Sequence, residues 1–166
     1  MIPRAAPAID LAHPTIADGV ACWELAAASK VLDVNSRYAY LLWCRDFAAT
    51  SVVARRDGAV VGFVTGYRRP DHPEVLVVWQ VAVDASARGG GVAGRMLEHL
   101  FDSLDATIME TTITPDNAAS IALFTAFARA RAAAVERTEL FGADLLGAGH
   151  EPEVLFRISP AESSKC

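Results

Sequence analysis

A glycine-rich segment at residues 87–94, ARGGGVAG, is the part of the sequence whose residue types and spacing most clearly indicate chemistry. It follows the apolar run VLVVWQVAV at residues 75–83 and is followed by MLEHL, which is typical of a helix. Glycines allow successive backbone N–H groups to turn toward one point, and a helix start adds the positive end of its dipole. Arg88 can add a charge-assisted hydrogen bond. The segment therefore predicts a cradle for a phosphate or pyrophosphate group.

Two other phosphate-binding motifs share part of this pattern. Gly89, Gly91 and Gly94 match G-x-G-x-x-G, and Glu110 follows at the spacing of a ribose-binding acid. Five residues separate the apolar run from the first glycine, however, and too few residues follow for a doubly wound sheet. A Walker loop is excluded because no Gly-Lys-Ser/Thr follows. A glycine-rich turn without a ligand remains an alternative, although its four glycines cost conformational entropy that a ligand site would explain.

Length, charge and cysteine content limit the classes of function. The 166 residues suit a single domain, and a net charge of −5 without a lysine-rich tract argues against nucleic acid as a partner. No apolar run approaches the roughly 18 residues of a membrane span, and the N-terminus does not resemble a secretory signal. We therefore expect a cytoplasmic protein that does not bind membranes. Cys22, Cys44 and Cys166 have neither disulfide nor zinc spacing, so we expect no metal.

The pattern of apolar and turn residues predicts an α+β fold, with one central mixed, mostly antiparallel sheet flanked by helices. Thr15 and Asp18 form a capping box, Ser36 is a helix cap, and Asp57-Gly58 is a hairpin turn. The expected helices cover residues 16–28, 38–47, about 92–104 and 117–133, and the expected strands cover 50–55, 59–67, 75–83, 107–114, 135–140 and 153–158. Residues 68–74 and 141–152 are expected loops. About twelve residues at the start and six at the end are expected to be loose, unless a short strand lies near Leu11.

Written as Arg88-x-x-Gly91-x-Ala93 after a strand, the segment resembles the acetyl-CoA signature R/Q-x-x-G-x-G/A of the GNAT acetyltransferase superfamily. The resemblance implies the GNAT fold, in which the strand at 107–114 diverges from the strand at 75–83 and leaves a V-shaped opening. It also implies that Val81, Ala82 and Val83 pair with the pantetheine arm, with a backbone N–H near Val81 polarising the thioester. The pyrophosphate would contact the N–H groups of Gly89, Gly90, Gly91, Val92, Ala93 and Gly94.

Residues 117–124, NAASIALF, resemble the N-x-x-A-x-x-L-Y helix of the same superfamily. The resemblance implies that Asn117, Ser120 and Phe124 lie beside acetyl-CoA. The tyrosine that commonly protonates the leaving thiolate is Phe124 in this chain. The general acid must therefore be another residue or water.

Four longer blocks resemble the diaminobutyrate acetyltransferases of ectoine biosynthesis, the pathway of a compatible solute made under osmotic stress. They are LDVNSRYAYLLWC, VVGFVTGYRRPDHPEVLVVWQVAVDASARG, TPDNAASIALF and GHEPEVLFRI, spread over residues 32–158. The resemblance implies acetyl transfer from acetyl-CoA to the γ-amine of L-2,4-diaminobutyrate by a homodimer. The sequence departs from the family at Ala93, where glycine is usual, and in the short spacing before the strand at 107–114. Another polyamine or basic amino acid as acceptor, and a regulatory module that binds CoA without turnover, remain the alternatives.

The chemistry of amine acetylation requires a proton acceptor, because an alkylammonium with a pKa near 10.4 is neutral in only about one part in 10³ at pH 7. The candidates for proton transfer are Glu110, Glu153 and Tyr38, which the sequence does not rank. The candidates for substrate binding are Asp33, Tyr38, Trp79, His150 and Glu153. Each has a plain alternative role as a turn, core or solvated residue. Arg37, Arg68 and Arg69 are unranked candidates for the substrate carboxylate.

Overall fold

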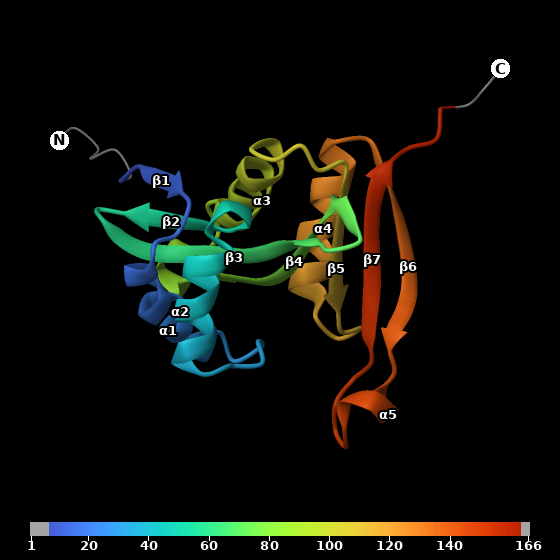
Figure 1. Ribbon diagram of the computed structural model, residues 1–166, viewed down its shortest axis with the longest axis horizontal. Coiled ribbons are helices and arrows are strands. Elements are labelled where there is room, and N and C mark those ends of the chain that lie inside the picture. The colour runs from blue at the N-terminus through green and yellow to red at the C-terminus, as the bar shows by residue number, and fades with distance from the viewer. Residues whose placement is uncertain (1–6, 164–166) are drawn as a thin grey trace. The chain divides into compact units, whose positions relative to one another are not determined.

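The computed structural model describes residues 7–163. Its helices and strands follow in the order β1 (Ile9–Ala12), α1 (Gly19–Ser29), α2 (Arg37–Asp46), β2 (Val52–Arg56), β3 (Ala59–Arg69), β4 (His72–Val83), α3 (Val92–Asp102), β5 (Ile108–Ile113), α4 (Ala118–Ala130), β6 (Ala133–Phe141), α5 (Ala143–Leu146) and β7 (Glu153–Pro160) (Figure 1). Short 3-10 helices are η1 (Ile16–Asp18), η2 (Ala48–Thr50) and η3 (Ala85–Ala87). The strand order is β1-β2-β3-β4-β5-β7-β6. Strands β4 and β5 are parallel and the pairs β1–β2, β2–β3, β5–β7 and β6–β7 are antiparallel, which confirms the expected α+β fold with a mixed sheet.

The chain divides into two compact units. The first comprises the residues up to Thr65 together with Gln80–Leu100, and the second comprises Gly66–Trp79 and the residues from Phe101 onward. Strands β3 and β4 each contribute residues to both units. The expected single domain stays a prediction.

The core of the first unit is formed by residues of the helices α1 and α2 and of the strands β2, β3 and β4 (Figure 1). Tyr40 on α2 is fully buried and meets the Phe63 ring edge-on, with 6.3 Å between the ring centroids. Its hydroxyl donates to Gln80 Oε1 at 2.8 Å, and Gln80 Nε2 donates to the Asp33 carbonyl at 2.9 Å. This chain of hydrogen bonds satisfies polar groups that burial would otherwise penalise, and it fixes the segment between α1 and α2.

Helix α3 approaches β3 closely at Gly62. A Cβ atom at this position would lie 3.1 Å from Met96 Cε and 3.2 Å from the Ala82 carbonyl oxygen. Both distances are shorter than ordinary van der Waals contact, so a side chain at position 62 would require the Met96 side chain and the Ala82 carbonyl to move by a few tenths of an ångström. The absence of a side chain at Gly62 therefore leaves room for Met96 of α3 beside β3.

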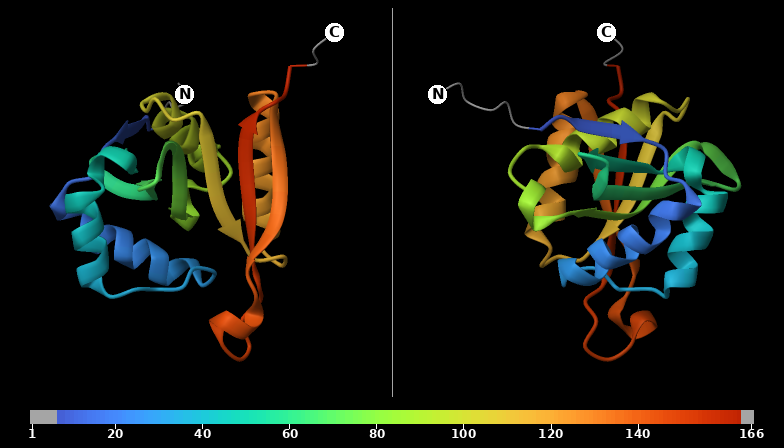
Figure 2. Two further views of the ribbon diagram at one scale, coloured as in Figure 1. Left: turned by 45° about the vertical axis from the view of Figure 1, so that its right-hand side comes forward. Right: turned by 90° about the vertical axis from the view of Figure 1, so that its left-hand side faces the viewer.

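The second unit has β5 as an interior strand, parallel to β4 on one side and antiparallel to β7 on the other. Helix α4 lies against the β6 and β7 part of this unit (Figure 2). The buried Phe127 on α4 meets Phe101 edge-on, with 5.6 Å between ring centroids. Arg131 places its guanidinium over both rings, at 4.8 and 4.9 Å from their centroids, and pairs with Asp102.

Three local predictions are confirmed by the backbone and its hydrogen bonds. Thr15 and Asp18 form a capping box, and the Ser36 hydroxyl accepts the Ala39 N–H at 3.3 Å to cap α2. Asp57 and Gly58 both have positive φ, 52° and 82°, as a type I′ hairpin turn requires.

Other local predictions were wrong. Ile9–Ala12 is a strand paired with β2, so the first dozen residues are not all loose, and the short strand near Leu11 makes β4 the fourth strand. The loop expected at 68–74 shrinks to two residues because β3 continues to Arg69 and β4 begins at His72. The carbonyl of Pro73 accepts Arg68 Nη1 at 2.7 Å, so a side chain bridges this hairpin. Residues 141–152 contain the short helix α5. Residues 1–6 and 164–166 lie outside the described residues.

A buried ion pair connects η1 to β2. Both Arg55 Nη atoms donate to the Asp18 carboxylate at 2.8 Å, and the Thr15 N–H donates to the same carboxylate at 2.7 Å. The Asp18 side chain is 8% exposed and that of Arg55 is 27% exposed. Burial opposes ionisation of Asp18, but the hydrogen bonds from Arg55 and Thr15 outweigh it and hold the pKa of Asp18 below its ordinary value of 3.8.

We predict that Asp18→Asn lowers the free energy of unfolding by about 3 kcal/mol, because the largely buried Arg55 loses its charged partner. Urea denaturation at about pH 7 measures this difference. The folded pKa is the lower one, so the contribution of Asp18 is complete above pH 3.8 and is lost as the pH falls through the folded pKa. The stability difference between the two proteins should therefore shrink in acid.

Asp46→Asn is the matched control, because Asp46 also accepts two hydrogen bonds from an arginine, Arg45, but on the surface of α2. Exposed pairs of this kind are screened by solvent, so the variant should unfold like the wild type. Equal destabilisation by both substitutions would contradict the role given to the Asp18 pair.

Candidate active site

The glycine-rich segment in the first unit has the geometry of an anion cradle. Gly89 and Gly91 have φ values of +83° and +71°, and a Cβ atom on either residue would meet nothing within 4 Å. Helix α3 begins at Val92, and the Arg95 N–H donates to the Gly91 carbonyl at 3.0 Å. The N–H groups of the first helical turn have no acceptor within a helix, and they carry its positive dipole end. The segment therefore offers open space and backbone donors to an anion.

The residues before this cradle anchor it to the sheet. The Asp84 N–H donates to the Val61 carbonyl at 2.7 Å, and the Asp84 carboxylate accepts the Ser86 N–H at 2.9 Å to cap η3. Arg88 Nε donates to the Val83 carbonyl at 3.2 Å. Val81, Ala82 and Val83 form the end of β4, with Ala82 buried and its neighbours half-buried. The strand end and the cradle are thus joined by short, hydrogen-bonded turns.

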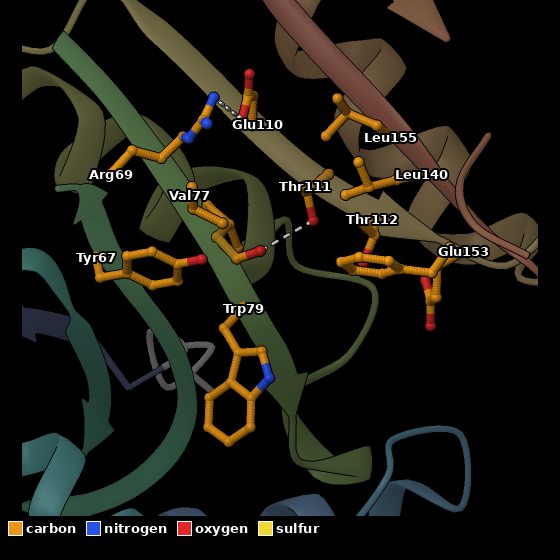
Figure 3. Close-up of a pocket in the computed structure, with 12 residues that line it drawn as sticks. Tyr67, Arg69, Val77, Trp79, Glu110, Thr111, Thr112, Leu140, Glu153 and Leu155 are labelled. Carbon is orange, nitrogen blue, oxygen red and sulfur yellow. Dashed lines mark hydrogen bonds and ion pairs between the residues drawn. The ribbon is translucent and has the colours of Figure 1, made fainter. Parts of the chain in front are cut away.

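A cavity of about 510 Å³ lies in the second unit, and we call it the sheet pocket (Figure 3). Its volume is in the range of small-molecule sites. Five strands line it, through Tyr67 and Arg69 of β3, Val77, Val78 and Trp79 of β4, Glu110, Thr111 and Thr112 of β5, Leu140 and Phe141 of β6, and Glu153 and Leu155 of β7.

The sheet pocket lies where the β4–β5 ladder ends. The last pair in register is Val78 with Thr111, although β5 continues to pair with β7 as far as Ile113. The Thr111 hydroxyl donates to the Val78 carbonyl at 3.1 Å, so a side chain replaces the next ladder bond (Figure 3). The expected parting of these two strands corresponds to this point, and Trp79 follows directly after it.

Three charged side chains of the sheet pocket differ in their partners. Glu110 is buried and accepts Arg157 Nη1 at 2.5 Å, and these two residues face each other in the β5–β7 register. Arg69 lies 3.8 Å from Glu110 and makes no hydrogen bond with the described residues. Glu153 is half-buried and its side chain has no hydrogen bond or ion pair with residues 7–163. The pocket thus has one uncommitted carboxylate and one loosely paired guanidinium, on opposite sides (Figure 3).

The structure brings Trp79, Glu110 and Glu153 of the predicted residues into this pocket. His150 precedes β7 outside the pocket lining, with its Nδ1 2.6 Å from the Glu151 carbonyl oxygen. Asp33 and Tyr38 belong to the first unit, where Tyr38 is 71% exposed.

The predicted residues on α4 are a cap and a core residue. Asn117 accepts the Ser120 N–H at 3.1 Å and so begins the helix. Phe124 is buried in the second unit. The proximity of these residues to a cofactor stays a prediction.

Tyr67, Thr112 and Arg157 were not predicted as site residues. Alternation along β3 places Tyr67 and Arg69 on one face, which the sequence could have indicated. Arg157 is a charged residue within the apolar run EVLFRI, which was also a usable signal. Among the described residues, no group of three His, Cys, Asp or Glu side chains could hold a metal ion, and no helix is long and apolar enough to cross a membrane.

Comparison with known proteins identifies the family. Residues 19–128 match the Acetyltransferase (GNAT) family. The chain is 54% identical to the L-2,4-diaminobutyric acid acetyltransferase of Streptomyces coelicolor, over 92% of this chain and 93% of that protein. It is 38% identical to the enzyme of the same name from Halomonas elongata, over 96% and 95% of the two chains.

Solved structures of acetyltransferases resemble this chain as well. The diaminobutyrate acetyltransferase EctA from Paenibacillus lautus, in complex with its substrate L-2,4-diaminobutyric acid and coenzyme A, superimposes with a TM-score of 0.90. It is 36% identical, and the match covers 97% of this chain and all of that one. Ard1 from Thermoplasma volcanium, 15% identical with a TM-score of 0.76 over 93% and 99% of the two chains, shares the fold. The chain therefore belongs to the GNAT family of acetyltransferases and, within it, to the L-2,4-diaminobutyric acid acetyltransferases.

Proposed function

We propose that this protein transfers the acetyl group of acetyl-CoA to the γ-amine of L-2,4-diaminobutyrate, as a step of ectoine biosynthesis. The observation that carries the proposal is the sheet pocket, which offers an uncommitted carboxylate and a loosely paired guanidinium to a small zwitterion. Relatives at 36% to 54% identity that bear this enzyme name support the same acceptor.

The residues of the first unit fit acetyl-CoA, which supplies the acetyl group on a thioester. We assign the pyrophosphate to the cradle of residues 89–94, because its open positive-φ glycines leave room for the phosphate oxygens. The half-buried Val81 and Val83 at the end of β4 are assigned to the pantetheine arm. A backbone N–H near Val81 would donate to the thioester oxygen as negative charge develops on it. Asn117, Ser120 and Phe124 remain the proposed neighbours of the cofactor on α4.

Among the three candidate arginines, the contacts favour Arg69 for the substrate carboxylate. Arg68 donates to a backbone carbonyl and to Asp105, and Arg37 stacks on the Trp23 ring at 4.5 Å. Arg69 lines the sheet pocket and has no hydrogen bond to lose among the described residues. Its planar fork suits a carboxylate, which it can bind with two parallel hydrogen bonds.

Glu110 is better suited to position Arg69 than to accept a proton. Arg157 Nη1 donates to Glu110 Oε1, and Arg69 lies 3.8 Å from Glu110 Oε2. A general base must lie within hydrogen-bond reach of the proton that it accepts, and both oxygens of Glu110 already face a guanidinium group.

Glu153 is the acid of the sheet pocket that can meet an ammonium group. It is half-buried and uncommitted, so we assign to it the binding of the γ-ammonium and the acceptance of its proton. Trp79 forms a wall of the pocket, two residues before Val81 on β4. Asp33, Tyr38 and His150 remain proposed substrate ligands, with Tyr38 as a further candidate for proton transfer.

We also propose the setting in which the enzyme works. The family resemblance and the charge of −5 favour a cytoplasmic homodimer that responds to osmotic stress and binds neither nucleic acid nor membranes. Its partners are then the diamine substrate and acetyl-CoA alone.

We predict rapid thiol release from acetyl-CoA with L-2,4-diaminobutyrate and slow release with ornithine, lysine or spermidine. In ornithine and lysine the terminal amine lies one and two methylene groups further from a carboxylate held on Arg69, and spermidine has no carboxylate for Arg69 to bind. Colorimetric detection of free CoA measures the rates. If thiol release is faster with another amine, that amine and not diaminobutyrate is the preferred acceptor. Binding of acetyl-CoA without release in any mixture would favour a regulatory module.

Gly91→Val is predicted to raise the KM for acetyl-CoA about tenfold or more. A β-branched residue at a φ of +71° is strained, and relief of the strain would turn N–H groups of the cradle away from the pyrophosphate. The loss of even one charge-assisted hydrogen bond, about 1.5–3 kcal/mol, accounts for this change. Steady-state kinetics with acetyl-CoA as the varied substrate measures the effect.

Gly58→Val is the matched control for this variant. Gly58 has a similar φ of +82° and open surroundings, but it lies in the β2–β3 turn. It should cost similar stability and leave the KM for acetyl-CoA unchanged. An unchanged KM in folded Gly91→Val would reject the cradle.

Arg69→Gln is predicted to raise the KM for L-2,4-diaminobutyrate by about tenfold to a hundredfold, because a hydrogen bond to a charged group contributes about 1.5–3 kcal/mol. The same variant should acetylate 1,3-diaminopropane as the wild type does, since that diamine lacks the carboxylate. Kinetics with both acceptors separate loss of this contact from a damaged pocket.

Arg68→Gln serves as the control, because Arg68 is the neighbouring arginine and is committed to Asp105 and a backbone carbonyl. It should leave both acceptors unaffected. An equal loss with both acceptors in Arg69→Gln would assign Arg69 to the pocket structure instead of the carboxylate.

A further inference from the structure

A second cavity of about 510 Å³ lies within the first unit, and we call it the arginine pocket. It is formed by the N-terminal segment, the end of β2, the residues around η3 and the start of α3. Arg56, Arg88 and Arg95 line it, together with Pro7, Ala8, Ile9, Ser86, Ala87, Gly90 and Val92. No acidic residue belongs to this lining, in a chain whose net charge is −5.

The three arginines are anchored by atoms of neighbouring segments. Arg56 donates through Nη1 to the Ser86 carbonyl at 3.2 Å and through Nη2 to the Ser86 hydroxyl at 2.6 Å. Arg95 Nη2 donates to the Ile9 carbonyl at 3.4 Å, and Arg88 Nε donates to a backbone carbonyl of β4. A guanidinium has five N–H donors, so each arginine keeps at least three that meet no described residue.

Asp84 is an acidic residue beside this group, and it interacts electrostatically with Arg56 and Arg88. Its carboxylate already accepts hydrogen bonds from the Ser86 N–H at 2.9 Å and the Ser86 hydroxyl at 2.5 Å. One such carboxylate does not balance three guanidinium groups. The pocket therefore presents excess positive charge, with donors to spare, which is the arrangement that suits a phosphate group.

The arginine pocket adjoins the cradle proposed for the pyrophosphate, because Gly90 and Val92 belong to both and Arg88 directly precedes the cradle. Coenzyme A carries, besides its pyrophosphate, a monoester phosphate on the 3′ position of the same ribose. A phosphate monoester has a second pKa near 6 and so carries a charge of about −1.5 to −2 at pH 7. We infer that the arginine pocket binds the 3′-phosphate of acetyl-CoA, with Arg56 and Arg95 as ligands; this inference rests on the proposed function.

The test compares the Kd values of CoA and 3′-dephospho-CoA by isothermal titration calorimetry. The wild type should bind CoA about tenfold to a hundredfold more tightly, since hydrogen bonds to a charged phosphate are removed with it. The difference should shrink as ionic strength rises, because these exposed charges are screened. Arg95→Gln and Arg56→Gln should each weaken CoA binding about tenfold and leave 3′-dephospho-CoA binding unchanged.

Arg45→Gln is the control, since Arg45 is an exposed arginine of the same unit that pairs with Asp46 on α2. It should change neither Kd. Equal binding of the two ligands by the wild type would overturn the inference. So would an equal loss of both ligands in Arg95→Gln and Arg56→Gln, because the arginines would then act on the part that the ligands share.

Two further outcomes distinguish this inference from the proposed acetyl-CoA site and from binding of a free anion. If the wild type binds neither ligand, the assignment of acetyl-CoA to the first unit fails, and this inference fails with it. If inorganic phosphate binds while CoA and 3′-dephospho-CoA have equal Kd values, the pocket takes a free anion and the 3′-phosphate assignment is overturned.

Discussion

The end of the parallel ladder between β4 and β5 is the constraint on which the site depends. A strand that leaves its neighbour must find other partners for its peptide groups, because unpaired buried groups are costly. Here the Thr111 hydroxyl takes over and donates to the Val78 carbonyl. Strand β4 can therefore continue beyond the ladder, and Trp79 occupies the wall of a cavity instead of a closed sheet. The sheet pocket therefore lies at the place where β4 and β5 stop pairing.

The charges at this opening depend on register. Glu110 faces Arg157 across the β5–β7 ladder and Val77 across the β4–β5 ladder, so the position of its backbone is fixed from two sides. A shift of one residue in either ladder would turn Glu110 to the other face of the sheet. The buried Met109 would then face the pocket. The antiparallel β5–β7 pairing therefore commits the Glu110 carboxylate to Arg157, and the donors of Arg69 stay available to a ligand.

Local features were predictable from the sequence, whereas features that need register were not. The capping box at Thr15, the type I′ turn at Gly58 and the glycine-rich cradle involve residues within a few positions of one another, so composition and spacing suffice. The Glu110–Arg157 pair joins residues 47 positions apart. Nothing in either strand alone specifies that pairing, which is why Glu110 stood among three unranked candidates for proton transfer. Strand β1 was left open as a short strand near Leu11, because four residues of mixed exposure give little periodic signal.

The two pockets match ligands of different charge. The arginine pocket has positive charge alone, as a polyanionic nucleotide requires, whereas the sheet pocket combines Arg69 with Glu153. Diaminobutyrate carries one carboxylate and two ammonium groups at neutral pH, a net charge of about +1, and a chain of net charge −5 attracts it. Acetylation removes the ammonium charge assigned to Glu153. On the proposed assignments, the product would keep its contact with Arg69 but lose the ion pair with Glu153 and its net positive charge. The charges proposed to bind the substrate would thus also favour release of the product.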